Sequence, residues 1–172
     1  MKNTLLLCFL IIEALTASVS AQWNDTGKLN AWTAATVSRA GNSEASIYLN
    51  SVRVAKNDGF DRLVFEFTGG VPRYQIKYEK SGTFATTGEE KIKVDGKYFM
   101  DVNLQSVPYP ESAGTKDITI PKGNQKLPVF YEIKEIEWFE GVREFGIGLN
   151  AKRAFRVQQL SSPFRLVIDF KQ

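Results

Sequence analysis

The strongest constraint on this chain is the alternation of apolar and polar residues that runs from residue 45 to the C-terminus. Leu63, Phe65 and Phe67 share one face of an extended segment, and charged residues occupy much of the other face. A period of two is typical of a half-buried β-strand, and no window longer than about ten residues has a helical period. The alternation recurs in residues 47–54, 74–78, 92–104, 129–133, 145–149, 155–157 and 164–170.

These segments predict an all-β fold of about eight or nine short, mostly antiparallel strands. Such strands form a sandwich or a small barrel, and we expect a β-sandwich over residues 45–172. The Asp58-Gly59 and Glu140-Gly141 pairs are hairpin signals between strands. Residues 105–127 are rich in Pro and polar residues, which predicts a long loop or arm, and loops of this length are often functional.

Residues 1–21 have the parts of a signal peptide. Lys2 supplies a positive start, residues 5–12 are apolar, and residues 19–21 are small, which suggests cleavage after Ala21. The apolar run is too short for a transmembrane segment, which needs about 20 residues. Cys8 lacks the surroundings of a lipoprotein cleavage site. We expect an exported protein, periplasmic or extracellular, soluble and without a lipid anchor; an N-terminal core helix is the alternative.

The polar, small-residue stretch 22–44 is predicted to be a flexible segment. Trp32 is an exception within it and could dock on the domain.

Missing residue types exclude several kinds of function. The chain has no His, and its one Cys lies in the leader, which excludes a Ser-His-Asp triad, a Cys nucleophile, a zinc site of His and Cys, and disulfides. We therefore expect no metal and no cofactor. The net charge of +3 is spread along the sequence, which argues against nucleic acid as a partner.

Two strands carry charges on their polar faces. Arg62 lies on one of them, and Arg165 and Asp169 lie on the last strand. The simpler interpretation is ion pairing within a sheet. The functional one is an arginine fork that grips a ligand carboxylate or a sugar hydroxyl.

Aromatic side chains offer a second kind of ligand contact, because flat rings stack on sugar rings. Most of them must be core. Tyr109 and Trp138 stand outside the clearest alternating runs, so we expect them to be exposed. Tyr74 and Arg73 share a strand that could present a mildly positive, aromatic surface.

The carboxylates could instead form a glycosidase pair, which needs two of them roughly 5 to 10 Å apart. Nothing in the sequence singles out a pair, and residues 132–135 are interpreted as an exposed charged edge. The candidates are Asp61, Glu66, Asp101, Glu132, Glu135, Glu137 and Asp169.

Two stretches resemble the AMIN-like domain family, which is similar to the AMIN module of bacterial cell-wall amidases and secretins. Residues 60–74, with Gly69-Gly70-Val71-Pro72, resemble the start of that domain, and residues 139–170 resemble its end. The resemblance implies a β-sandwich in the bacterial cell envelope that binds wall material and is itself not catalytic. It supplies no catalytic residues.

The resulting hypothesis is a non-catalytic module that binds peptidoglycan or another cell-wall glycan. The residues chosen for binding on chemical grounds are Arg62, Arg73, Tyr74, Tyr109, Trp138, Arg165 and Asp169. A protein–protein module of an envelope assembly and a small-ligand carrier with a barrel interior remain as alternatives, with a carbohydrate-cleaving enzyme behind them. The sequence leaves the oligomeric state open.

Overall fold

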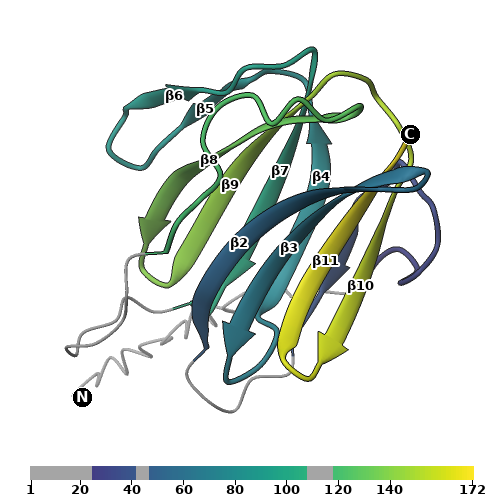
Figure 1. The fold of residues 1–172 in the computed structure, drawn as a ribbon. Coiled ribbons are helices and arrows are strands. Elements are labelled where there is room, and N and C mark those ends of the chain that lie inside the picture. Colours follow the sequence, from purple (N-terminus) through teal and green to yellow (C-terminus); the bar gives the residue numbers. More distant parts are fainter. Residues whose placement is uncertain (1–24, 42–46, 108–117) are drawn as a thin grey trace, which may run out of the picture.

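The computed structural model describes residues 25–41, 47–107 and 118–172. Every regular element in these ranges is a strand, and nine of the eleven strands form two stacked antiparallel sheets (Figure 1). The prediction of an all-β fold is confirmed. No helix in the described ranges has the length and apolar character needed to cross a bilayer.

The first sheet has five strands and the second has four. The five-stranded sheet has the order β1 (Val37–Arg39), β4 (Arg73–Glu79), β7 (Tyr98–Gln105), β9 (Val142–Leu149) and β8 (Phe130–Phe139). The four-stranded sheet has the order β10 (Phe155–Ser161), β11 (Phe164–Lys171), β3 (Phe60–Thr68) and β2 (Tyr48–Asn57). A small hairpin of β5 (Thr83–Ala85) and β6 (Lys91–Lys93) completes the fold.

The core is the layer of aromatic and aliphatic side chains between the two sheets. Phe65 of β3 and Phe145 of β9 come from opposite sheets and have ring centroids 5.1 Å apart. Phe130 and Phe170 make a second such contact at 5.9 Å. Burying one side chain of this size stabilises the fold by about 1.5–3 kcal/mol. The space that a barrel carrier would leave for a ligand is occupied by these rings.

Two predicted turns are present. Asp58 and Gly59 join β2 to β3, and Glu140 and Gly141 join β8 to β9. Glu140 and Gly141 have φ of 47° and 76°. Positive φ at both central residues is the type I′ geometry, which matches the twist of the flanking strands.

The β5–β6 hairpin lies on the outer face of the five-stranded sheet. Phe84 and Val94 pack there against Ile136. Gly148 of β9 allows the close approach, because a Cβ on it would lie 1.8 Å from the carbonyl oxygen of Asp95. Glu132 is buried and accepts a hydrogen bond from the Asp95 N–H at 2.8 Å. The interpretation of residues 132–135 as an exposed charged edge is therefore wrong for Glu132.

The segment expected to be flexible is built into the sandwich where it is described. Residues 37–39 form β1 and pair with β4, and Thr33 bridges to Phe155 of β10. The segment thus reaches both sheets along one open side. The polar composition of the segment does not indicate this pairing, because the pairing uses backbone groups. Among its described residues, Val37 is the one fully buried apolar side chain. Residues 1–21, the predicted signal peptide, lie outside the described residues.

Part of the predicted loop 105–127 packs on the core. Ile118, Ile120 and Leu127 are partly buried against it, and no strand forms between residues 118 and 129. Tyr109 lies outside the described residues.

Candidate functional site

One row of polar side chains crosses the outer face of the five-stranded sheet. The strand register places Gln75 opposite Asn103, Asn103 opposite Glu144, and Glu144 opposite Glu137. Ser38 of β1 ends the row beside Gln75, whose Nε2 donates to its Oγ at 3.4 Å. We call this row the polar ladder: Ser38, Gln75, Asn103, Glu144 and Glu137. All but Ser38 are half-buried, so amide and carboxylate groups reach solvent in a line across the sheet.

The adjacent row adds an exposed aromatic ring. It consists of Arg73, Gln105, Val142 and Phe139, taken from β4, β7, β9 and β8. Phe139 is 50% exposed, the most of any large apolar side chain in the described residues. It follows Glu137 by two residues and so shares its face. A ring beside a line of hydrogen-bonding groups suits a ligand with both a flat apolar face and many hydroxyl or amide groups.

Burial and like charges shape the ionisation of this face. Burial raises the pKa of Glu144, and the neighbouring Glu137 raises it further. Burial also raises the pKa of Asp101 to about 7, with a contribution from Glu144, against the opposing effect of Lys77. Asp101 Oδ1 is buried and accepts no hydrogen bond from the described residues. Lys77 is held by Glu79, whose hydrogen bond raises the pKa of the ammonium group. Protons are therefore retained on this face at higher pH than free carboxyl groups would allow.

The β5–β6 hairpin borders the ladder on the β8 side. The backbone N–H and hydroxyl of Thr87, in the loop between β5 and β6, both donate to one Glu137 oxygen. Glu137 is thus fixed in place and has its second oxygen left for other partners. The hydrogen bonds from the hairpin loop and the packing of the hairpin hold this end of the ladder in place.

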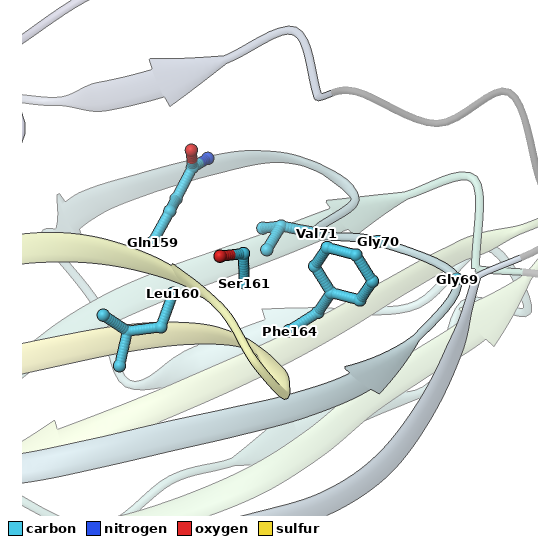
Figure 2. A pocket seen from close by; sticks show the side chains of 7 residues that line it. All are labelled: Gly69, Gly70, Val71, Gln159, Leu160, Ser161 and Phe164. Carbon is cyan, nitrogen blue, oxygen red and sulfur yellow. The ribbon is translucent and has the colours of Figure 1, made fainter.

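A pocket of about 390 Å³ opens at one end of the sandwich (Figure 2). Its lining combines Phe164 and Leu160, both exposed, with the backbone of Gly69 and Gly70. Gln159 and Ser161 supply the polar groups. The volume falls in the range of small-molecule sites, but few polar side chains converge in it.

Arg62 and Asp169 face each other across β3 and β11. Arg62 donates two hydrogen bonds to Asp169, at 2.7 and 2.9 Å, and Arg156 of β10 donates a third at 2.8 Å. Asp169 is fully buried beneath these two guanidinium groups. The expectation that Asp169 contacts a ligand is wrong, because its oxygens are covered. The guanidinium of Arg62, expected to bind a ligand, already donates two hydrogen bonds to Asp169. Ion pairing within the sheet is what the structure shows.

Tyr74 is fully buried, so it cannot stack on a ligand, and its prediction as a binding residue is wrong. Its hydroxyl accepts a hydrogen bond from Gln159 Nε2 at 3.3 Å, and burial raises its pKa to about 12.

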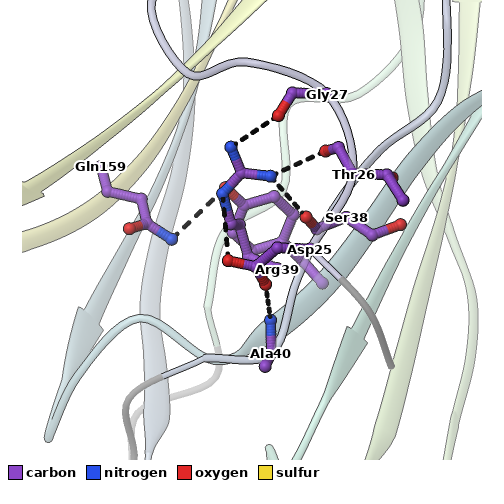
Figure 3. Close-up of polar contacts among 8 residues, drawn as sticks. Asp25, Thr26, Gly27, Ser38, Arg39, Ala40 and Gln159 are labelled. Carbon is purple, nitrogen blue, oxygen red and sulfur yellow. Dashed lines mark hydrogen bonds and ion pairs between the residues drawn. The ribbon is translucent and has the colours of Figure 1, made fainter. Parts of the chain in front are cut away.

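Arg39 lies close by. It donates to the carbonyl oxygens of Thr26, Gly27 and Ser38, fastening the N-terminal segment (Figure 3).

The other predicted residues are spread over the molecule. Arg73 joins the row beside the ladder and donates to the Ala40 carbonyl at 3.2 Å. Arg165 faces outward from the other sheet and donates to the carbonyls of Ser162 and Pro163. Trp138 is half-buried, donates to the Val107 carbonyl at 2.8 Å, and lies under the Arg143 guanidinium at 4.0 Å. The six predicted residues that the structure describes therefore do not form one site.

Comparison of the chain with known protein families gives one family match. Residues 47–172 match the model of the AMIN-like domain. The chain belongs to the AMIN-like domain family. Membership of this family suggests a module associated with the cell envelope. Neither the curated proteins nor the solved structures contain a significant match to it.

Sequence reasoning missed the ladder of this AMIN-like domain. The sequence pattern offers Glu137 only as one carboxylate of a possible catalytic pair, and it does not single out Gln75, Asn103 or Glu144. The signal was the outward position of each within its alternating strand. Only the register shows that these positions meet in one row. In the described part of the chain, no group of three or more acidic residues is placed to hold a metal ion.

Proposed function

We propose that this AMIN-like domain binds peptidoglycan through the polar ladder and Phe139, without cleaving it. The observation that carries the proposal is the alignment of amide and carboxylate groups across neighbouring strands beside an exposed ring. Membership of an envelope-associated family supports a ligand of the cell wall.

The chemistry of the ladder suits an N-acetylated glycan. Sugar hydroxyls and N-acetyl amides both donate and accept hydrogen bonds, and the side chains of Gln75 and Asn103 do the same. Glu137 and Glu144 accept from hydroxyls. Phe139 offers a face to the apolar side of a sugar ring. Arg73, in the same row as Phe139, supplies a guanidinium for the carboxylates of the peptide stems.

Neighbouring strands in a sheet are about 4.8 Å apart, so a ladder of this kind spans about 15–20 Å. That length accommodates several sugar units, and the affinity of one site would be weak. Binding to a polymer with repeated units would strengthen it through multivalency.

The proposal also covers localisation. Residues 1–21 would direct export and be removed after Ala21. The mass of the protein recovered from the cell envelope tests this part, because retention of the leader would contradict cleavage.

Co-sedimentation with purified peptidoglycan sacculi tests the binding site. At physiological salt the protein should pellet with sacculi, and a Phe139→Ser, Asn103→Ala double variant should bind at least fivefold more weakly. The matched control is Tyr98→Ser, because Tyr98 is 43% exposed on the same sheet but away from the ladder. Thermal midpoints of both variants should stay within a few degrees of wild type.

Three results would contradict the proposal: no binding to sacculi, equal binding by both variants, or release of soluble fragments from labelled sacculi. The first, together with a stable complex in envelope extracts, would favour a protein partner. The last would make Glu137 and Glu144 candidates for a catalytic pair, since a raised pKa beside a second carboxylate is typical of glycosidases.

A further inference from the structure

The outer face of the four-stranded sheet, opposite the ladder, gathers positive charge. The strand register places its outward side chains in parallel rows across β10, β11, β3 and β2. The cations of these rows are arginines, with one lysine at the end of β11. We call this surface the arginine face: Arg53, Arg62, Arg156, Arg165 and Lys171, with Glu66 and Asp169 among them.

The two carboxylates of this face neutralise only part of the charge. Asp169 is buried and shared by Arg62 and Arg156, and Glu66 pairs with Arg53 at 2.8 Å. Within the described residues, neither Arg165 nor Lys171 has a carboxylate partner at ion-pair distance. The face therefore keeps an excess of positive charge.

The other outer face of the sandwich has the opposite balance. The polar ladder contributes Glu137 and Glu144, and the neighbouring rows add Asp101 and Glu79 against the cations Lys77 and Arg73. An anionic partner would thus be attracted to one side of the molecule and oriented by it.

Apolar side chains accompany the cations. Trp32 is 38% exposed with the Arg156 guanidinium 4.7 Å from its ring, and Leu160, at the far end of β10, is 37% exposed. Phe60 lies between Arg62 and Arg156, at 5.0 and 5.2 Å from them. Trp and Arg together are typical of proteins at the lipid–water interface, where the ring enters the headgroup layer and the guanidinium meets phosphate.

We propose that the arginine face docks on the anionic surface of a phospholipid bilayer. A sheet face is broad, and its cations are spread over four strands and not gathered in a pocket, which suits a plane of headgroups better than a single small anion. One guanidinium group can donate two parallel hydrogen bonds to the oxygens of one phosphate. This surface is separate from the polar ladder, so one domain could contact the membrane and the wall at the same time.

Sedimentation with vesicles tests the proposal. The probes are vesicles of phosphatidylcholine alone and vesicles with 30% phosphatidylglycerol, the percentage being about that of a moderately anionic membrane. The wild-type protein should bind only the anionic vesicles, and more weakly as salt is raised. Binding equal on both kinds of vesicle, or none on either, would overturn the proposal.

Two matched double variants locate the surface. Arg165→Gln with Lys171→Gln should weaken binding to anionic vesicles by roughly fivefold for each charge removed. Lys91→Gln with Lys93→Gln removes the same charge from the exposed side of β6, away from the arginine face, and should change binding less than about twofold. Trp32→Ser should also weaken binding.

Equal losses in the two double variants would show that only overall charge matters and would overturn the docking surface. Sacculi distinguish this proposal from the previous one, because the arginine-face variant should pellet with sacculi as wild type does. If that variant no longer bound sacculi but still bound anionic vesicles, the arginine face would bind the wall polymer, and the membrane proposal would be wrong.

Discussion

Replacing Asp169 by Asn should destabilise the fold strongly although the side chain lies on an outward face. Asp169 is fully buried and accepts three hydrogen bonds of 2.9 Å or less from Arg62 and Arg156. The amide keeps the shape, removes the charge, and turns one acceptor into a donor that faces arginine donors. Breaking a fully buried ion pair costs about 3–5 kcal/mol.

Solvent reduces that cost here. The side chains of Arg62 and Arg156 are 31% and 26% exposed, so water screens part of the uncompensated charge. We expect a loss of about 2–4 kcal/mol in the free energy of unfolding. For a domain of this size, the thermal midpoint should fall by roughly 5–15 °C.

Urea unfolding followed by tryptophan fluorescence measures the change. The control is Asp58→Asn, the same substitution at an exposed turn residue before Gly59, where Asn-Gly is as favourable as Asp-Gly. It should change the free energy of unfolding by less than about 0.5 kcal/mol. A loss below about 1 kcal/mol for Asp169→Asn would refute the view that this cluster holds β3, β10 and β11 together.

Three further predictions follow from other contacts. Gly148→Ala should cost at least about 3 kcal/mol in urea unfolding, because the new methyl group meets the Asp95 carbonyl at 1.8 Å, whereas Gly88→Ala should be nearly neutral; equal effects would contradict the tight hairpin packing. The folded-state pKa of about 7 for Asp101 lies above its usual value, so stability should fall as pH rises from about 4 to 7 and then level off. Asp101→Asn should flatten that part of the profile, and an unchanged slope would exclude Asp101 as its source. Arg39→Met should speed proteolysis of residues 25–41 several-fold, since three carbonyl contacts are lost, while Lys28→Met on the exposed side should not.

The sandwich could be predicted from the sequence because its strands carry the signal locally. In β3, Leu63, Phe65 and Phe67 are all buried and alternate with the less buried residues Arg62, Val64 and Glu66. The shortest strands, β1, β5 and β6, have three residues each, which is too few for a period to show. β1 and β5 were not predicted, and β6 was included in the alternating run 92–104 together with β7. Their presence depends on partners distant in the chain, such as Ile76 for Val37.

Most of the candidate site could not be predicted from the sequence, for a related reason. Alternation gives the face on which a residue lies but not its neighbours across the sheet. The pairing of Arg62 with Asp169 spans 107 residues, and no local pattern indicates that Arg156 covers the same carboxylate. Tyr74 shows the opposite error: it was expected to offer an aromatic surface, but its ring is fully buried and Gln159 satisfies its hydroxyl inside the fold.

The most direct test of the central claim is an NMR titration of the ¹⁵N-labelled protein with soluble muropeptides. The account predicts that amide shifts concentrate on the strands of the polar ladder, around Gln75, Asn103, Glu144 and Phe139, and leave β2, β3, β10 and β11 nearly unchanged. Shifts centred on the four-stranded sheet, or on the pocket beside Phe164, would contradict it.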